Sequence, residues 1–355
     1  MARILASLFL CALLPARMLA WNAEGHMVVS QIAYNHLDSV VRTRCDALIA
    51  VQLANTNPIT TSFVTAACWA DDFKSTLGTG LWHYIDLPFS LDGASTNGVG
   101  TAAFDVVRAI NQCIATLQDT NAAPTNRATC LRYLLHFVGD IQQPLHCSTA
   151  VTFGDLNGDA GGNSFNLTGG NWSNLHSLWD SGGGFLSDSV SRPLSTTGKN
   201  NLSNRVAIVE AAYPFTGTPG TIPNPQAWAD EGWLLAQSVC YAGITNSTAP
   251  TANYLNTATA TTAARMALGG KRLTDLLNTI FAPAPVPLLA PMVAGGNFSF
   301  SWSATAGKTF RVQWKPELTQ VGWSDLADIT AATSNVTFTN AIGAAQKFYR
   351  VVGVD

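Results

Sequence analysis

The sequence predicts a mainly helical domain followed by a small all-β domain. Apolar residues recur at three- and four-residue steps through residues 21–281, a proline-rich segment follows, and the apolar period then changes to two. Of the 355 residues, 47% are hydrophobic and 12% are charged, and the formal net charge is −3. This composition excludes a mainly disordered chain and a broadly basic surface that coats nucleic acid. A phosphate site would therefore need a local positive centre.

Residues 1–20 have the pattern of a signal peptide. Arg3 precedes an apolar run that is too short to cross a bilayer, and the small residue Ala20 ends the segment. No later stretch reaches transmembrane length. We therefore expect cleavage after Ala20, a secreted or periplasmic protein without a membrane span, and Trp21 as the first residue of the mature chain.

Residues 21–281 form the predicted helical domain. Apolar residues that share one helix face are Phe104, Val107, Ile110, Ile114 and Leu117, and then Leu273, Leu276, Leu277 and Ile280. Segments 131–141 and 228–241 also have helical periodicity. Residues 153–170 are rich in Gly, Asn and Asp, which predicts a loop or hairpin.

The C-terminal part begins with residues 282–291, whose repeated prolines cannot continue a helix and predict an extended linker. In residues 292–355, apolar residues alternate and predict strands that form a small antiparallel β-sandwich. The alternating positions are Phe298, Phe300 and Trp302; Phe310, Val312 and Trp314; Val336 and Phe338; and Phe348, Arg350 and Val352. This part resembles fibronectin-type modules appended to bacterial exoenzymes. It contains no motif that indicates its target.

Six cysteines remain after cleavage, namely Cys45, Cys68, Cys113, Cys130, Cys147 and Cys240. An even set in an exported protein favours disulfide bonds, and the absence of a CxxC motif argues against a thiolate zinc site. The pairing we favour is Cys45 with Cys68, which flank a predicted helical pair.

Histidines and aspartates at helical spacing indicate the chemistry. His136 and Asp140 stand four residues apart, and so do His176 and Asp180, which places each pair on one helix face. A proline between Asp140 and His146 ends the first helix and lets His146 turn toward a second metal. A single histidine on a helix is more often a capping, core or surface residue. Two such pairs, one extended by His146, favour a metal centre of imidazole and carboxylate ligands.

With these residues the chain resembles the secreted single-strand-specific zinc nucleases of fungi, plants and bacteria, which share a fold with the bacterial zinc phospholipases C. The resemblance covers about residues 21–281. It rests on six motifs in the order of the family: Trp21-x4-His26, Trp69-Ala-Asp71, His83-Tyr-Ile-Asp86, His136-x3-Asp140-x5-His146, Gly161-Gly-Asn163 and Asn174-Leu-His176-x3-Asp180.

The resemblance implies three Zn2+ ions in one cleft of a zinc phospholipase C/nuclease-like helical domain. The implied ligands are Asp71, His83, His136 and Asp140 for one ion; the amine and carbonyl oxygen of Trp21, with His26 and Asp140, for a second; and His146, His176 and Asp180 for the third. Three divalent cations exceed the charge of these carboxylates, so the acidic chain would gain its positive centre at this site.

The resemblance also implies roles for four further residues. Asp86 would orient the attacking water, and Lys74 stands where the family has an arginine, so it supplies charge without a bidentate fork. Tyr84 would stack on an unpaired base, and Asn163 would bind the edge of a base. The alternatives are core packing for Tyr84 and a turn position for Asn163.

The implied function is a zinc endonuclease that cleaves single-stranded DNA and RNA to 5′-phosphate products and acts as a 3′-nucleotidase. A zinc-dependent phospholipase C is the first alternative, because the metal ligands alone do not distinguish phosphodiester substrates. A zinc-containing binding protein is the second, although three protein ligands for the third ion leave an open position, which is typical of catalytic zinc.

Overall fold

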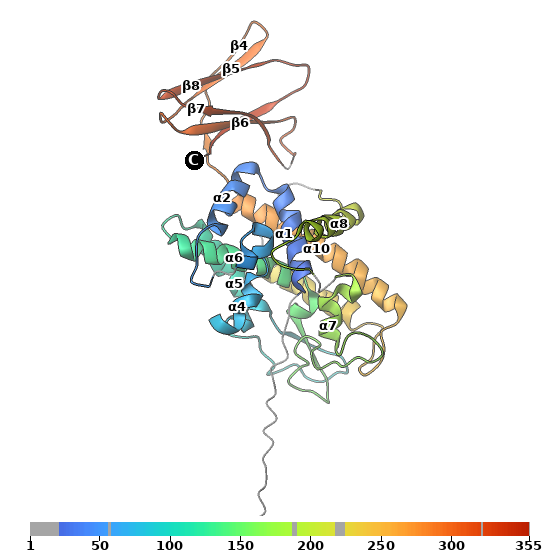
Figure 1. The fold of residues 1–355 in the computed structure, drawn as a ribbon. Helices are drawn as coiled ribbons and strands as arrows, with labels where there is room; N and C mark the ends of the chain where they lie inside the picture. Colours follow the sequence, from blue (N-terminus) through green and yellow to red (C-terminus); the bar gives the residue numbers. More distant parts are fainter. Residues whose placement is uncertain (1–20, 56–57, 187–189, 217–223, 321, 355) are drawn as a thin grey trace, which may run out of the picture.

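The computed structural model describes residues 21–354 except 56–57, 187–189, 217–223 and 321. Within these residues, helices extend to Ile280 and strands of a separate β-domain begin at Pro285 (Figure 1). The predicted fold class, a mainly helical domain followed by a small all-β domain, is confirmed. The predicted signal peptide lies outside the described residues.

The helical domain consists of α-helices joined by turns and loops. It also contains one two-stranded sheet. Its α-helices are α1 (Ala23–His36), α2 (Ser39–Ile49), α3 (Phe63–Ala66), α4 (Trp69–Leu77), α5 (Val106–Gln118), α6 (Pro124–Asp140), α7 (Leu175–Asp180), α8 (Thr196–Ala212), α9 (Pro225–Leu235) and α10 (Ala252–Ile280). The shorter elements are η1 (Pro58–Thr60), η2 (Gly80–His83), η3 (Pro144–Cys147), η4 (Gly182–Gly184), the π-helical turn η5 (Ala236–Cys240), and the parallel strands β1 (Leu87–Ser90) and β2 (Ser148–Val151).

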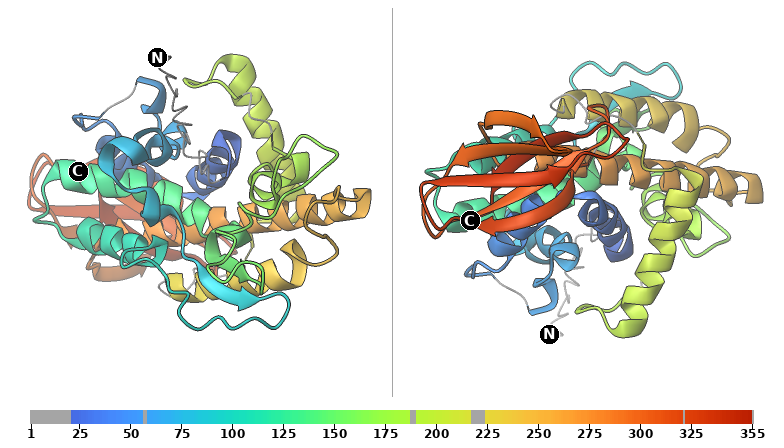
Figure 2. Two further views of the ribbon diagram at one scale, coloured as in Figure 1. Left: turned by 90° about the horizontal axis from the view of Figure 1, so that it is seen from below. Right: turned by 90° about the horizontal axis from the view of Figure 1, so that it is seen from above.

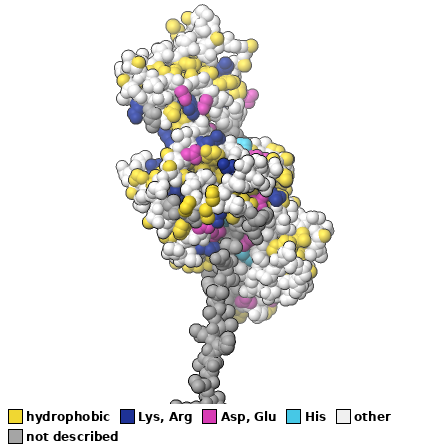
Figure 3. Space-filling view, viewed as in Figure 1, with side chains coloured by type: hydrophobic (Ala, Val, Ile, Leu, Met, Phe, Trp, Pro, Cys, Tyr) yellow, Lys and Arg dark blue, Asp and Glu magenta, His cyan; other side chains and the backbone are white. Residues whose placement is uncertain are grey.

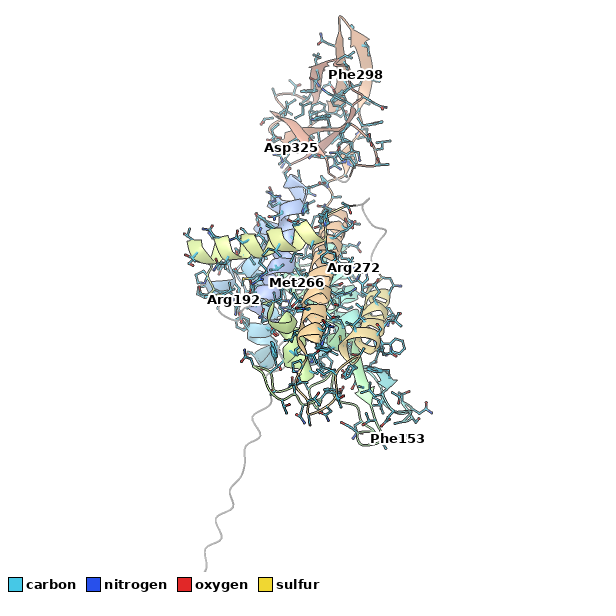
Figure 4. All side chains as sticks on the ribbon, turned by 90° about the vertical axis from the view of Figure 1, so that its right-hand side faces the viewer. Phe153, Arg192, Met266, Arg272, Phe298 and Asp325 are labelled. Carbon is cyan, nitrogen blue, oxygen red and sulfur yellow. The ribbon has the colours of Figure 1, made fainter. Side chains whose placement is uncertain are left out.

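The core of this domain lies between α1, α6 and α10. The longest helix, α10, is capped by the side chain of Thr251, which accepts a hydrogen bond from the Tyr254 amide. Its buried face includes Met266, which Figure 4 shows midway along the helical domain. α6 begins with a proline at its first turn, where no amide donor is needed, and it ends at Asp140. The predicted break before His146 is therefore present.

The β-domain contains two antiparallel sheets. Its strands are β3 (Pro285–Val286), β4 (Leu289–Ala294), β5 (Asn297–Ser303), β6 (Thr309–Lys315), β7 (Ser324–Thr330), β8 (Asn335–Ala341) and β9 (Phe348–Gly353). The strand orders are β3-β9-β6-β7 and β4-β5-β8. Phe300, Trp302 and Val312 are among the residues that fill the shared core, as the alternating pattern predicts.

Two of these strands begin within the predicted linker at residues 282–291. β3 contains Pro285 and β4 contains Pro291, and both strands lie at the edge of their sheets. An edge strand tolerates proline because one side of its backbone has no partner strand. The proline-rich segment thus contributes to the β-domain instead of only leading to it.

The β-domain rests on one end of the helical domain beside α2 (Figures 1 and 2). Arg350 Nη2 lies 3.1 Å from Asp38 Oδ2, and Ser39 Oγ donates to Asp325 Oδ2 at 2.8 Å. Figure 4 shows Asp325 at the edge of the β-domain that faces the helices. Hydrogen bonds and an ion pair therefore join the two domains at the start of α2.

The surface carries few charges. On the face drawn in Figure 3, lysine and arginine side chains are scattered singly or in small groups among uncharged residues. Among the described residues, no helix is long and apolar enough to span a membrane. Cys45 and Cys68 are buried free thiols, so the disulfide predicted between them is not formed in this structure; Cys68 Sγ instead donates to the carbonyl of Ala23.

Candidate metal centre

The two His–Asp pairs that the sequence predicts at helical spacing lie on α6 and α7. His136 Nε2 lies 3.2 Å from Asp140 Oδ2 on α6, and His176 Nε2 lies 3.4 Å from Asp180 Oδ2 on α7. The side chain of Asn174 caps α7 and thereby starts this short helix two residues before His176. Local helix geometry is sufficient to bring each imidazole next to its carboxylate.

Residues from three other elements join the α6 pair. Asp71 lies in the first turn of α4, His83 ends η2, and His26 lies near the start of α1. His83 Nδ1 is 3.0 Å from Asp140 Oδ2 and 3.6 Å from Asp71 Oδ1. His26 Nε2 is 3.4 Å from Asp140 Oδ1. Asp140 therefore lies between His26 on one side and His83 on the other.

The described side chains form three groups that could each hold a metal ion. These groups are His26, Asp71 and His136; His83, His136 and Asp140; and His146, His176 and Asp180. In each group the potential ligand atoms lie within 4.8 Å of one another. The first two groups share His136, and His146 Nδ1 lies 3.8 Å from Asp140 Oδ1, so the three groups are continuous. We call these eight residues the His/Asp cluster.

Backbone carbonyls orient three of the imidazole rings. The Nδ1 atoms of His136, His146 and His176 donate to the carbonyls of Ala67, His83 and Gly161 at 2.6, 3.0 and 2.7 Å. Each bond places the proton of the neutral ring on Nδ1, so Nε2 is the ring nitrogen that can bind a metal. This arrangement is typical of histidines that bind metals.

Several atoms of the cluster are buried without a hydrogen-bond partner. They include both carboxylate oxygens of Asp140, both ring nitrogens of His26, Nε2 of His83 and Nε2 of His146. An unsatisfied buried polar atom is costly, so a concentration of them indicates a missing partner. Tetrahedral zinc ligands at about 2.0–2.1 Å from the ion lie about 3.3 Å apart. The separations between His and Asp atoms, 3.0 to 3.8 Å, fit such a partner.

The electrostatics of the cluster favour bound cations. Burial lowers the pKa of His26 to about 3, so its ring is neutral and able to ligate. Burial opposes ionisation of Asp71, but His136, His83 and Lys74 outweigh it and lower its pKa to about 2. The pKa of Asp140 is also held well below its usual value by His136 and His83, against the effect of burial. The carboxylates are therefore ionised at neutral pH.

Trp21 holds the beginning of the described chain against this cluster. Its indole is fully buried and donates to the carbonyl of Gly139 at 2.9 Å. The next residue, Asn22, donates its amide to the carbonyl of Asp180 at 3.2 Å. The backbone at Trp21 thus lies between the helices that carry Asp140 and Asp180.

Glycine is needed at two points where backbone and ligand approach closely. A Cβ atom at Gly139 would lie 2.9 Å from His26 Nδ1, so α6 can pack against the His26 ring only without a side chain there. Gly161 has φ +63°, and a Cβ at this position would lie 2.3 Å from the carbonyl oxygen of Leu145. The same residue supplies the carbonyl that orients His176.

The structure places the predicted catalytic and substrate-binding residues in different settings. Lys74 Nζ lies 2.9 Å from Asp71 Oδ1, beside the cluster. Asp86 is half-buried, and burial together with Asp159 raises its pKa to about 6 against the effect of His146. Tyr84 is half-buried, two residues before Asp86. Asn163 donates its side-chain amide to the carbonyl of Ala160 at 2.8 Å, as a turn residue would.

The residues that support the ligands through hydrogen bonds and ion pairs lie outside the predicted motifs. Gln143 Nε2 donates to Asp180 Oδ1 at 2.8 Å. Tyr241 donates its hydroxyl to Asp159 Oδ2 at 2.6 Å, which fixes the carboxylate next to Asp86. Arg192 forms a bidentate pair with Asp72, the neighbour of Asp71, at 2.7 and 3.0 Å. A buried glutamine directly after the α6 ligand pair is the one signal that could have indicated such support.

The chain is similar in sequence to known nucleases. The sequence model of the family described as S1/P1 Nuclease matches residues 21–282. Nuclease PA3 of Penicillium sp is 26% identical over 281 residues, which cover 73% of this chain and 97% of that protein. Endonuclease 1 of Arabidopsis thaliana is 26% identical over 312 residues, covering 79% of this chain and 92% of that protein. Among solved structures, the alpha toxin from Clostridium absonum aligns with a TM-score of 0.38 and 9% identity over 95% of this chain and 88% of that one.

Proposed function

The chain belongs to the S1/P1 nuclease family, and we propose that it is a secreted, zinc-dependent endonuclease that cleaves single-stranded DNA and RNA to 5′-phosphate products and removes 3′-phosphates from nucleotides. The observation that carries this proposal is the His/Asp cluster, whose buried atoms lack partners in three adjoining groups. A metal ion that only stabilises the fold does not require two further potential metal sites beside it, so three adjoining groups favour a catalytic role.

The proposed ligand sets are those implied by the family motifs, and the cluster geometry supports them. Asp71, His83, His136 and Asp140 would hold one zinc ion; the Trp21 backbone, His26 and Asp140 a second; and His146, His176 and Asp180 a third. When bound, zinc ions polarise phosphate oxygens and lower the pKa of water toward about 7. Three ions would also give this weakly charged chain the positive centre that a phosphodiester requires.

The side chains around the cluster have distinct proposed tasks. Asp86, ionised above about pH 6, would accept a hydrogen bond from the attacking water and orient it toward phosphorus. Lys74 would attract the phosphate, since its ammonium lies beside Asp71 at the edge of the cluster. These residues position the reactants by charge and hydrogen bonding.

Selection for single strands would depend on unpaired bases. The half-buried ring of Tyr84 would stack on a base, which accepts any base but requires that it be unpaired. The Asn163 amide nitrogen is engaged with Ala160, so base recognition by Asn163 would use its Oδ1 atom.

Export would complete the centre. Cleavage of the signal peptide after Ala20 would create a free α-amine at Trp21, between the helices that carry Asp140 and Asp180. We assign residues 21–281 to the nuclease domain, 282–291 to the connection and 292–355 to an accessory β-domain.

An assay of heat-denatured DNA, duplex DNA and phosphatidylcholine side by side tests this function. We expect rapid cleavage of denatured DNA to 5′-phosphate ends, slow cleavage of duplex DNA, and no release of choline phosphate. Asp180→Asn should abolish the activity, whereas Asp230→Asn, an exposed position outside the cluster, should retain it. Choline phosphate release without DNA cleavage would favour the phospholipase alternative, and zinc binding without hydrolysis of either substrate would favour a binding protein.

A further inference from the structure

Two cysteines face each other across the hairpin of α5 and α6. Cys113 lies five residues before the end of α5 at Gln118, and Cys130 lies six residues after the start of α6 at Pro124. In an antiparallel hairpin, residues at similar distances from the turn lie near each other. The thiols of Cys113 and Cys130 are accordingly in hydrogen-bond contact.

The pair borders a cavity that is separate from the His/Asp cluster. The cavity has a volume of about 230 Å3 and is lined by both cysteines, by the rings of Trp82, Phe104 and Tyr133, and by polar residues of α5 and α6. Cys113 is buried, whereas Cys130 is partly exposed. A small reagent that enters the cavity therefore meets Cys130 before it meets Cys113.

The two thiols differ in reactivity. Hydrogen bonds from Cys113 and Thr116 lower the pKa of Cys130 to about 7, against the opposing effect of burial. The contact with Cys130 and burial raise the pKa of Cys113 well above its usual value. Because Cys130 is also the more exposed of the two, we expect it to be the attacking thiolate and Cys113 the resolving thiol.

We propose that Cys113 and Cys130 form a disulfide bond that ties α5 to α6 in the mature protein. The proposal rests on the export proposed above, because exported proteins meet disulfide oxidants. The Cys130 thiolate attacks a small-molecule or protein disulfide RSSR, forms a mixed disulfide and releases RS−. Cys113 then loses its proton and attacks the Cys130 sulfur, releasing the second RS−. In total, two protein thiols become one disulfide while RSSR becomes two RSH.

The proposed bond has a consequence for the cluster, because α6 carries both Cys130 and the ligand pair. His136 and Asp140 lie six and ten residues beyond Cys130 on the same helix. A cross-link between α5 and α6 restricts opening of the hairpin, so it opposes the local unfolding that would release these ligands. Removal of metal by a chelator should therefore be slower in the oxidised protein.

The other described cysteines are placed differently. Cys68 Sγ donates to the carbonyl of Ala23, and Cys147 Sγ donates to the carbonyl of Ile141. Burial raises the pKa of Cys45 well above its usual value and that of Cys68 to about 12. These thiols lack the exposed, low-pKa partner that makes Cys130 reactive.

Peptide mapping of the full-length protein tests the proposal. Protein equilibrated with oxidised glutathione is denatured with N-ethylmaleimide present, digested without reductant, and analysed by mass spectrometry. We expect a cross-linked peptide containing Cys113 and Cys130, and maleimide labels on Cys45 and Cys68. Labelling of both Cys113 and Cys130 in the oxidised sample would overturn the proposal.

Thermal melting provides a second readout that does not depend on nuclease activity. Reductant should lower the Tm of the wild-type protein by about 5–10 °C, the effect of opening a loop of this length. The double variant Cys113→Ala/Cys130→Ala should show no such shift, whereas Cys45→Ala/Cys68→Ala should keep it. A reductant shift that persists in the first variant would contradict the proposed bond even if the enzyme is active.

Discussion

The helical domain and the β-domain differ in how many of their buried polar atoms lack hydrogen-bond partners. In the β-domain, buried Gln313 and Lys315 both find partners: Gln313 donates to Asp325 Oδ1 at 2.6 Å, and Lys315 donates to the carbonyl of Leu318 at 2.8 Å. In the helical domain, Asp140 and His26 are fully buried and leave oxygen and nitrogen atoms unsatisfied. Both domains pack around apolar cores, so the difference does not come from poor packing of the helical domain. Trp302 Nε1 in the β-domain is also buried without a partner, so a single such atom does not indicate a site. The concentration of such atoms on the His and Asp side chains of one cluster marks the region that we expect to bind metal.

The largest expected effect comes from the carboxylate at the centre of the cluster. Asp140→Asn replaces a charge that serves two groups of ligands with a neutral amide. We expect a loss of nuclease activity well beyond the about 100-fold typical of residues that only support metal ligands, together with loss of bound zinc. Metal analysis and an oligonucleotide assay measure both effects. Full zinc occupancy in the variant would contradict the shared role of Asp140.

A smaller effect is expected where backbone and ligand meet. Gly139→Ala places a methyl group 2.9 Å from His26 Nδ1, so the ring must move away from Asp140. We expect the affinity for zinc of the site that includes His26 to fall by about 10–100-fold while the protein remains folded. Gly100→Ala is the matched control, because a Cβ there meets no atom within 4 Å. Equal affinities of the two variants for zinc would refute the close approach.

The pH dependence should reflect Asp86. Its pKa is raised to about 6 by burial, and the protonated carboxyl is uncharged and a weaker hydrogen-bond acceptor for water than the carboxylate. Activity should therefore fall as the pH decreases below about 6, approaching tenfold per pH unit, and bound cations would move the midpoint lower. The Asp86→Asn variant should have low activity at every pH, and its activity should not show this additional fall below about pH 6. An unchanged acidic limb in the variant would assign the titration to another group.

The smallest effect is expected from removal of the β-domain. A chain ending at Phe281 lacks the Arg350–Asp38 ion pair and the Ser39–Asp325 hydrogen bond, contacts that contribute about 0–1 kcal/mol each when partly exposed. Cleavage of short oligonucleotides should stay within about twofold of the full-length value. An insoluble or inactive product would show that the β-domain completes the helical core. Reduced action on polymeric substrates alone would point to a targeting role.

Residues linked by local geometry were predictable from the sequence, and residues linked across the fold were not. The four-residue spacing of His136 and Asp140 sets their contact on any helix, and the α10 and β5 patterns identified their elements. β7 (Ser324–Thr330) escaped prediction because its residues are largely exposed and show no apolar alternation. The contact between Asp159 and Tyr241 joins residues 82 positions apart, and the Cys113–Cys130 contact requires the register of a helical hairpin.

Zinc content, measured beside mass spectrometry of the N-terminus, tests the metal centre most directly. Mature protein beginning at Trp21 should bind three zinc ions per chain and be active, because its free α-amine lies between the helices carrying Asp140 and Asp180. A protein with extra residues before Trp21 should fold, bind two zinc ions and be nearly inactive, since an amide nitrogen resists losing its proton to a metal. Three zinc ions and full activity in the extended protein would remove Trp21 from the centre. Fewer than three ions in the mature, active protein would contradict the trinuclear account itself.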